Sequence, residues 1–167
     1  MGCCLATLAL LESRPAHAFE GLWHLGMGAG VSVPNDPYRA AAALSLHGAY
    51  GISDVFDVRL TATGSLLHLS PDGGRQNSLS LGTLGIAYKL DIIEWIPYCG
   101  VRAGFFVFGK APEGGAARQG GALGGMCGID YAFSRSAALG VELSRDFLLP
   151  EGHVFGALLH AEYRWGL

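Results

Sequence analysis

The sequence predicts an all-β fold, a single eight-stranded antiparallel up-and-down transmembrane β-barrel, and three observations lead to it. From residue 19 onward, apolar residues alternate with small or polar ones in about eight successive segments, and a period of two is that of a strand with two different faces. The chain is 50% hydrophobic and 15% charged, yet no stretch supplies the ~18 consecutive apolar residues of a membrane-spanning helix. Gly contributes 26 of 167 residues, which suits a wall that bends around a narrow interior.

The last segment shows the alternation most clearly. Its apolar positions are Phe155, Ala157, Leu159, Ala161, Tyr163, Trp165 and Leu167. Charged residues such as Glu162 and Arg164 occupy positions between them. A sheet with an apolar outer surface and inward charges is the reverse of a soluble protein and is typical of a barrel in lipid.

The first three strands follow this pattern in order. The first is predicted at about 19–33, with its odd-numbered residues outward, and a Pro-rich turn follows at 34–37. The second is predicted at about 38–50, with its even-numbered apolar residues outward. The third places the apolar residues of 56–66 outside and the polar ones inside, and a clear loop follows at 71–77.

The fourth strand changes phase partway along. Leu79 and Leu81 have one parity, whereas Leu84 and Ile86 have the other. If all four face lipid, a β-bulge near Gly82-Thr83 must restore the register, because a bulge inserts one extra residue into a strand.

The remaining four strands repeat the alternation. They are predicted at about 99–107, 123–133, 139–146 and 155–167, with a link at 91–97, a long loop at 109–119 and turns at 134–136 and 149–152.

The aromatic residues are predicted to gather at two heights. One set falls at the strand ends away from the longer loops: Trp23, Tyr50, Phe56, Tyr88, Trp95, Tyr98, Tyr131, Phe133, Tyr163 and Trp165. The other falls at the opposite ends: Tyr38, Phe105, Phe106, Phe108, Phe147 and Phe155. Aromatic rings prefer the boundary between water and lipid, so two belts indicate two membrane interfaces.

Residues 1–18 are predicted to be a signal peptide and residues 19–167 the barrel. The apolar core at 5–11 precedes Ala16-His17-Ala18, which fits the small-x-small cleavage pattern. The usual positive residues before the apolar core are missing, so we expect the leader to be incomplete. The alternative is a short apolar N-terminal helix without a role in export.

Charge and cysteine content exclude several classes. The net charge is −3 and the chain has no basic run, so nucleic acid is not an expected partner. The four cysteines are Cys3, Cys4, Cys99 and Cys127, without a C-x-x-C spacing. We therefore expect neither a zinc site nor a disulfide framework, and interpret the last two as small apolar residues on the lipid side of neighbouring strands.

Four stretches resemble small outer-membrane barrels of the OmpA/OmpX/OmpW-like kind. They are Leu84-Gly-Ile-Ala-Tyr-Lys-Leu-Asp91, Ile96-Pro-Tyr-Cys-Gly-Val-Arg-Ala-Gly104, Gly128-Ile-Asp-Tyr-Ala-Phe133 and Leu139-Gly-Val-Glu-Leu143. The resemblance implies a Gram-negative outer membrane with lipopolysaccharide and other lipid as partners. It also implies that barrel-assembly machinery reads the C-terminal strand, although such chains usually end on Phe and this one ends on Leu167. The even number of strands places both termini on one side, expected to be the periplasmic one.

The inward charges are the candidate functional residues. We predict a structural charge network in the lumen from Arg39, Asp57, Arg59, Arg102, Asp130, Glu142, Glu162 and Arg164. Further inward candidates are Lys89, Asp146, His24, His47 and His160. Eight strands enclose an interior that side chains can fill, so paired charges of both signs would close it. The alternative is a narrow pore for small solutes, because many inner residues are Gly or Ala.

The sequence gives little support for catalysis or cofactors. A lipid-modifying outer-membrane enzyme would need a Ser–His–acid group at the lipid boundary. Ser144, Glu151 and His153 near one rim are the nearest approximation. The inner histidines lack a compact ligand spacing, so no metal site and no cofactor are predicted. The loops are short for an adhesin, and we therefore predict a mainly structural, surface-presenting barrel that is not an enzyme.

Overall fold

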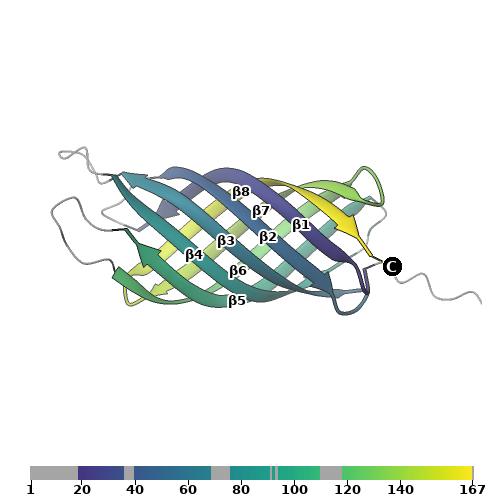
Figure 1. Ribbon diagram of the computed structural model, residues 1–167, viewed down its shortest axis with the longest axis horizontal. Coiled ribbons are helices and arrows are strands. Elements are labelled where there is room, and N and C mark those ends of the chain that lie inside the picture. Colours follow the sequence, from purple (N-terminus) through teal and green to yellow (C-terminus); the bar gives the residue numbers. More distant parts are fainter. Residues whose placement is uncertain are drawn as a thin grey trace, which may run out of the picture.

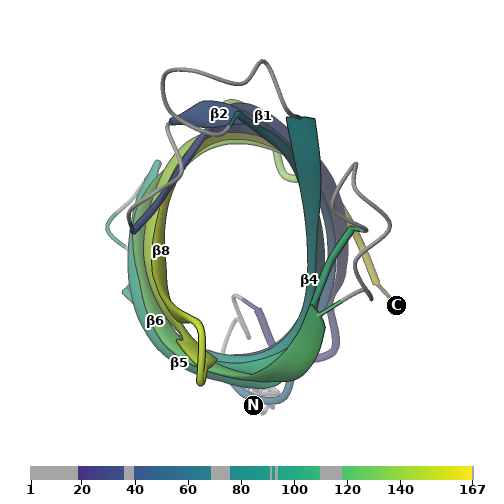
Figure 2. The ribbon, with the colours of Figure 1, turned by 90° about the vertical axis from the view of Figure 1, so that its left-hand side faces the viewer.

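The computed structural model describes residues 19–35, 40–68, 76–90, 92, 94–109 and 118–166. Its eight strands form a closed antiparallel barrel in which each strand pairs with the next and β8 pairs with β1 (Figures 1 and 2). The strands are β1 Trp23–Pro34, β2 Ala41–Gly51, β3 Phe56–His68, β4 Gln76–Lys89, β5 Trp95–Phe108, β6 Arg118–Ala132, β7 Ala137–Leu149 and β8 Gly152–Trp165. The predicted fold class is confirmed. The predicted leader, residues 1–18, lies outside the described residues.

The two ends of the barrel differ. At one end, here called the terminal end, β1 begins beside the last residue of β8, so that Trp23 pairs with Trp165 (Figure 1). The short turn between β6 and β7 lies at this end as well. The opposite end, here called the loop end, carries the connections that follow β1, β3, β5 and β7. No helix among the described residues is long and apolar enough to cross a membrane.

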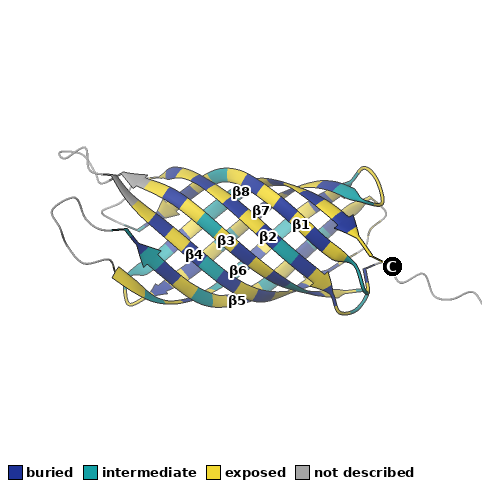
Figure 3. Cartoon of the chain, viewed as in Figure 1, coloured by how far each residue is buried: buried dark blue, intermediate teal, exposed yellow. Residues whose placement is uncertain are grey.

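Burial alternates along every strand, but with the polarity of a membrane protein (Figure 3). Large apolar side chains face outward, with Val101 71% and Leu44 68% exposed. Charged side chains face inward, with Asp130 fully buried and Arg59 2% exposed. An apolar exterior around a polar interior is the arrangement that a hydrocarbon solvent favours.

The predicted bulge in β4 is wrong. The strand keeps one uninterrupted register with both β3 and β5 from Leu79 to Tyr88. Leu79 and Leu81 therefore face the interior, where they are 2% and 6% exposed. The prediction failed because it assumed a polar lumen along its whole length, whereas the lumen at the loop end is apolar and favours inward Leu.

The interpretation of Cys99 and Cys127 is also wrong in part. Both residues face outward on neighbouring strands, as predicted, but they form a disulfide between β5 and β6. The register places them directly opposite one another, with their Cα atoms 4.1 Å apart. A separation of 28 residues in the sequence gives no sign of this pairing.

Most of the predicted aromatic residues lie on the outer surface, and several touch across strands. At the terminal end Trp23 contacts Tyr50, Trp95 contacts Tyr131 and Phe56 contacts Tyr88. The assignment of Tyr98, Phe106 and Phe108 to the outer belts is wrong, because all three are buried in the interior. Tyr38 lies outside the described residues.

Candidate functional site: the barrel interior

The half of the interior nearer the terminal end is filled by buried charged side chains, here called the charge network. Its carboxylates are Asp57, Asp130, Glu142, Asp146 and Glu162, and its cations are Arg59, Lys89, Arg102 and Arg164. His24, His47, His160 and Tyr98 are buried among them. Five carboxylates against four cations and three histidines leave the network close to neutral, which burial of so many charges requires.

Glu162 is one centre of the network. Its Oε1 atom accepts a hydrogen bond from Arg164 Nε at 2.7 Å and lies 2.9 Å from His24 Nδ1. Its Oε2 atom lies 3.1 Å from His47 Nε2. These contacts join β8 to β1 and β2 across the point where the barrel closes.

Glu142 is a second centre, on β7, the strand that pairs with β8. It accepts hydrogen bonds from Arg59 Nη1 at 3.2 Å, from Arg102 Nη1 at 3.3 Å and from the Tyr98 hydroxyl at 3.1 Å. Arg59 also stacks on Tyr98, with its Cζ atom 4.7 Å from the ring centroid. One carboxylate therefore ties together β3, β5 and β7.

Aspartates complete the connections between these centres. Asp130 lies 2.9 Å from His160 Nε2 and accepts a hydrogen bond from Arg164 Nη2 at 3.2 Å, so Arg164 joins Asp130 to Glu162. Asp57 lies 2.7 Å from Lys89 Nζ, a pairing by charge whose geometry is not that of an aligned hydrogen bond. Arg102 Nε donates to Asp146 Oδ1 at 2.8 Å.

Inward glycines allow these side chains to meet. Each of four hydrogen-bonded pairs comes from two strands separated by a third, and the third strand carries Gly at the position between them. The triplets are Tyr98–Gly128–Glu142, Arg102–Gly124–Asp146, Asp130–Gly140–His160 and His47–Gly26–Glu162. A Cβ atom on any of these glycines would overlap a side chain of its pair. The high glycine content thus creates the space in which the network forms.

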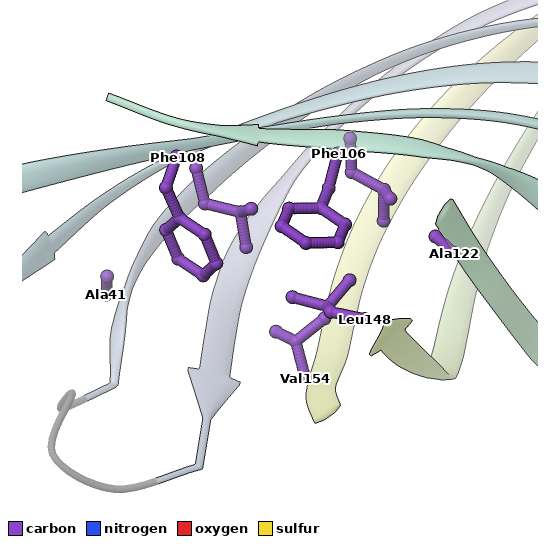
Figure 4. Close-up of a cluster of buried hydrophobic side chains, with 8 residues drawn as sticks. Ala41, Phe106, Phe108, Ala122, Leu148 and Val154 are labelled. Atoms are coloured by element: carbon purple, nitrogen blue, oxygen red, sulfur yellow. The ribbon is translucent and has the colours of Figure 1, made fainter. Parts of the chain in front are cut away.

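The other half of the interior, nearer the loop end, is apolar (Figure 4). Its residues, here called the apolar cluster, are Ala41, Leu79, Leu81, Phe106, Phe108, Ala122, Leu148 and Val154. Phe106 is fully buried and contacts Phe108 edge to face, with ring centroids 5.5 Å apart. Between the apolar cluster and the charge network lies a cavity of about 20 Å³, room for roughly one water molecule.

The structure brings seven of the eight predicted lumen residues together, and Arg39 lies outside the described residues. Lys89, Asp146 and the three histidines, named only as inward candidates, belong to the same network. Tyr98 was missed, although it shares the even-numbered parity of Arg102 on β5 and could have been found from it. The apolar cluster was not predicted, because inward Leu and Phe break the expected alternation and suggest a shift in strand register.

The three rim residues weighed for catalysis do not form a catalytic group. Ser144 lies on β7 and faces the interior of the barrel, whereas His153 lies on the outward parity of β8, opposite Phe147. Glu151 pairs with Arg118 at 2.6 Å. Ser144 and His153 are therefore on opposite faces of the wall.

Comparison with known proteins rests on structure alone. No protein-family model and no curated protein matches the sequence. The outer membrane protein OprG from Pseudomonas aeruginosa superposes with a TM-score of 0.73 at 13% identity, covering 89% of this chain and 98% of OprG. The chain has the fold of the small outer-membrane barrels.

Two further solved barrels also superpose on this chain. Neisserial surface protein A gives a TM-score of 0.68 at 15% identity, over 89% of this chain and 98% of its own. Ail, the attachment invasion locus protein of Yersinia pestis, gives 0.60 at 15% identity, over 87% of this chain and 99% of its own. The similarity to small outer-membrane barrels thus extends over nearly the whole described chain.

Proposed function

We propose that this protein is an integral barrel of a Gram-negative outer membrane with a mainly structural, surface-presenting role and a closed lumen. The observation that carries the proposal is the double filling of the interior, by the charge network in one half and the apolar cluster in the other. A conduit for solutes needs a continuous path, and the space between these two layers is about 20 Å³.

The membrane location is supported by the outer surface and by the fold. Outward-facing strand residues are predominantly large and apolar, and aromatic residues lie at both ends of the wall. Solved barrels of the same fold are described as an outer membrane protein, a surface protein and an attachment protein. The proposed partners are outer-membrane lipid, lipopolysaccharide and, for the C-terminal strand, the barrel-assembly machinery.

The alternative function is a narrow pore for small solutes, and ion conductance separates the two. If each layer closes the lumen by itself, removing only one layer should leave the lumen closed. We expect no steady conductance in planar bilayers from the unmodified protein, from Phe106→Ala with Leu148→Ala, or from Arg102→Ala with Arg59→Ala. All four substitutions together should conduct.

The matched control for the apolar layer is Phe105→Ala, which removes the same ring from the outward face of the same strand. It should leave the lumen closed both in the unmodified protein and together with Arg102→Ala and Arg59→Ala. Steady conductance through the unmodified protein would overturn the closed-lumen proposal and favour the pore. Turnover of labelled lipid by the inserted barrel would instead favour the lipid-modifying enzyme.

A further inference from the structure

The outer wall carries one charged side chain that the closed-barrel role does not use. Arg145 is the only Lys, Arg, Asp or Glu on the outward parity of the eight strands, among the residues whose side chains the structure describes. It lies on β7 toward the loop end, two residues before Phe147. A cation facing hydrocarbon is costly, and such residues mark functional sites more often than other surface residues do.

The surroundings hold the guanidinium in place without neutralising it. Its Cζ atom lies 4.8 Å from the centroid of the Phe147 ring and 4.9 Å from that of Phe155. Rings at these distances attract the cation. Among the described residues no carboxylate pairs with Arg145, in contrast to Arg59, Arg102, Arg118 and Arg164. Within the part of the chain that the structure describes, the hydrogen-bond donors of the guanidinium are therefore available to an anion.

A groove in the outer wall begins at this cation. It has a volume of about 550 Å³ and an almost wholly apolar lining that includes Val31, Cys127, Leu143 and Ala157. The hollow arises where small residues replace large ones, since Gly125 pairs directly with Arg145 and Ala157 with Leu143. Volumes of this size are typical of small-molecule sites.

Two other outer grooves lack the charge. One hollow, of about 570 Å³, is lined by residues of β3 to β6. A second, of about 520 Å³, is lined by residues of β1, β2, β7 and β8. Neither is lined by an outward-facing charged side chain among the described residues. The combination of a cation, two rings and an apolar groove thus occurs at one place in the described wall.

We propose that this groove binds a phosphorylated membrane lipid, with its phosphate on Arg145 and an acyl chain along Leu143, Cys127 and Ala157. A guanidinium binds phosphate oxygens through two parallel hydrogen bonds, and the apolar lining matches hydrocarbon. The inference rests on the proposed membrane placement, in which the loop end faces the outer leaflet and the occupant is a lipid of that leaflet.

The test uses the full barrel inserted in phosphatidylcholine vesicles that contain dioleoyl phosphatidic acid, with retained lipid counted by native mass spectrometry. Arg145→Gln should retain the phosphatidic acid about tenfold less well, and Arg145→Lys should fall in between, because Lys offers charge without the planar pair of donors. Gly125→Leu fills the groove and keeps the cation, and should also lose the lipid. A Cβ at Gly125 meets only the Gly100 carbonyl oxygen at 3.6 Å, an ordinary van der Waals contact, so the first atom of the added side chain fits against the wall.

Arg135→Gln is the matched control, because it removes an exposed Arg from the β6–β7 turn at the terminal end. Equal retention by the unmodified protein and Arg145→Gln would overturn the inference. So would full retention by Gly125→Leu, or displacement of the lipid by equimolar inorganic phosphate, since either result removes the acyl chain from the recognition. A barrel that inserts and conducts ions would contradict the closed lumen alone, whereas one that does not insert would overturn both proposals.

Discussion

Arg102 and Asp146 meet across a strand to which neither belongs. Arg102 is on β5 and Asp146 on β7, and Arg102 Nε donates to Asp146 Oδ1 at 2.8 Å above Gly124 of β6. A Cβ atom at Gly124 would overlap the Asp146 carboxylate. The ion pair therefore depends on the absence of a side chain at a third position, and the same relation recurs at Gly26, Gly128 and Gly140.

We predict that Gly124→Ala destabilises the barrel by about 3–5 kcal/mol, the usual cost of separating a buried charge from its partner. The added methyl group displaces the Asp146 carboxylate from Arg102. The free energy of unfolding in urea, measured in lipid vesicles, gives the cost. Gly121→Ala is the matched control on the same strand, because a Cβ there meets no atom within 4 Å. It should change stability by less than about 0.5 kcal/mol, and equal costs for the two variants would contradict the role of Gly124.

Arg102 and Asp146 should also be energetically coupled. Arg102→Ala leaves two carboxylates, Asp146 and Glu142, without a hydrogen-bond donor that they now share, and should cost on the order of 3–5 kcal/mol. Removing Arg102 and Asp146 together should cost less than the sum of the single changes, because the second substitution removes the unpaired charge. A double-mutant cycle in the same unfolding assay measures the difference. Strictly additive losses would mean that the two groups do not interact in the membrane.

Depth in the membrane should decide the cost of a charge on the outer face. Replacing Leu60, Val141 or Leu159 by Arg should cost about 2–4 kcal/mol, since each side chain faces outward near the middle of its strand. Leu149→Arg, on the same face of β7 as Val141 but at its end, should cost only about 0–1 kcal/mol. Replacing the inward Thr61 or Ser144 by Ala should cost much less than the midplane changes. Equal losses of stability for Val141→Arg and Leu149→Arg would mean that the hydrocarbon of the membrane does not surround this wall.

The mature protein is predicted to begin at or near Phe19. Phe19 is 5% exposed, and its ring lies beneath Lys89 and Arg164, with Lys89 Nζ 5.3 Å from the centroid. Cleavage after Ala18 would keep this contact at the terminal end of the lumen. Mass spectrometry of the protein from outer membranes tests the prediction, and retention of residues 1–18 would contradict it.

The orientation of the barrel can be tested with single cysteines. We expect a membrane-impermeant thiol reagent to label Glu151→Cys at the loop end of intact cells, and not Arg135→Cys at the terminal end. Both positions lie in turns, so accessibility and not secondary structure decides the result, and permeabilised cells serve as the control for reactivity. The reverse labelling would place the termini outside the cell.

The amino-acid sequence alone predicts the eight strands and the face of most of their residues, but it misplaces Leu79 and Leu81 of β4 and the inward aromatic residues of β5. A period of two assigns each residue to one side of the wall, as for Asp130 inside and Ile129 outside, because successive side chains in a strand must point in opposite directions. The same parity placed Asp57, Arg59 and Glu162 in the interior without knowledge of their partners.

The pairs of residues that meet are set by the three-dimensional fold. Cys99 bonds to Cys127, and Arg102 reaches Asp146 over Gly124, because the register between strands sets these distances. The pattern of one strand carries no information on its offset from the next. The division of the lumen into charged and apolar halves could not be predicted for a related reason. Inward Leu81 and Phe106 are favourable only because they pack against each other and Leu148. The alternation of a strand indicates which face a residue lies on, but not which side chains surround it there.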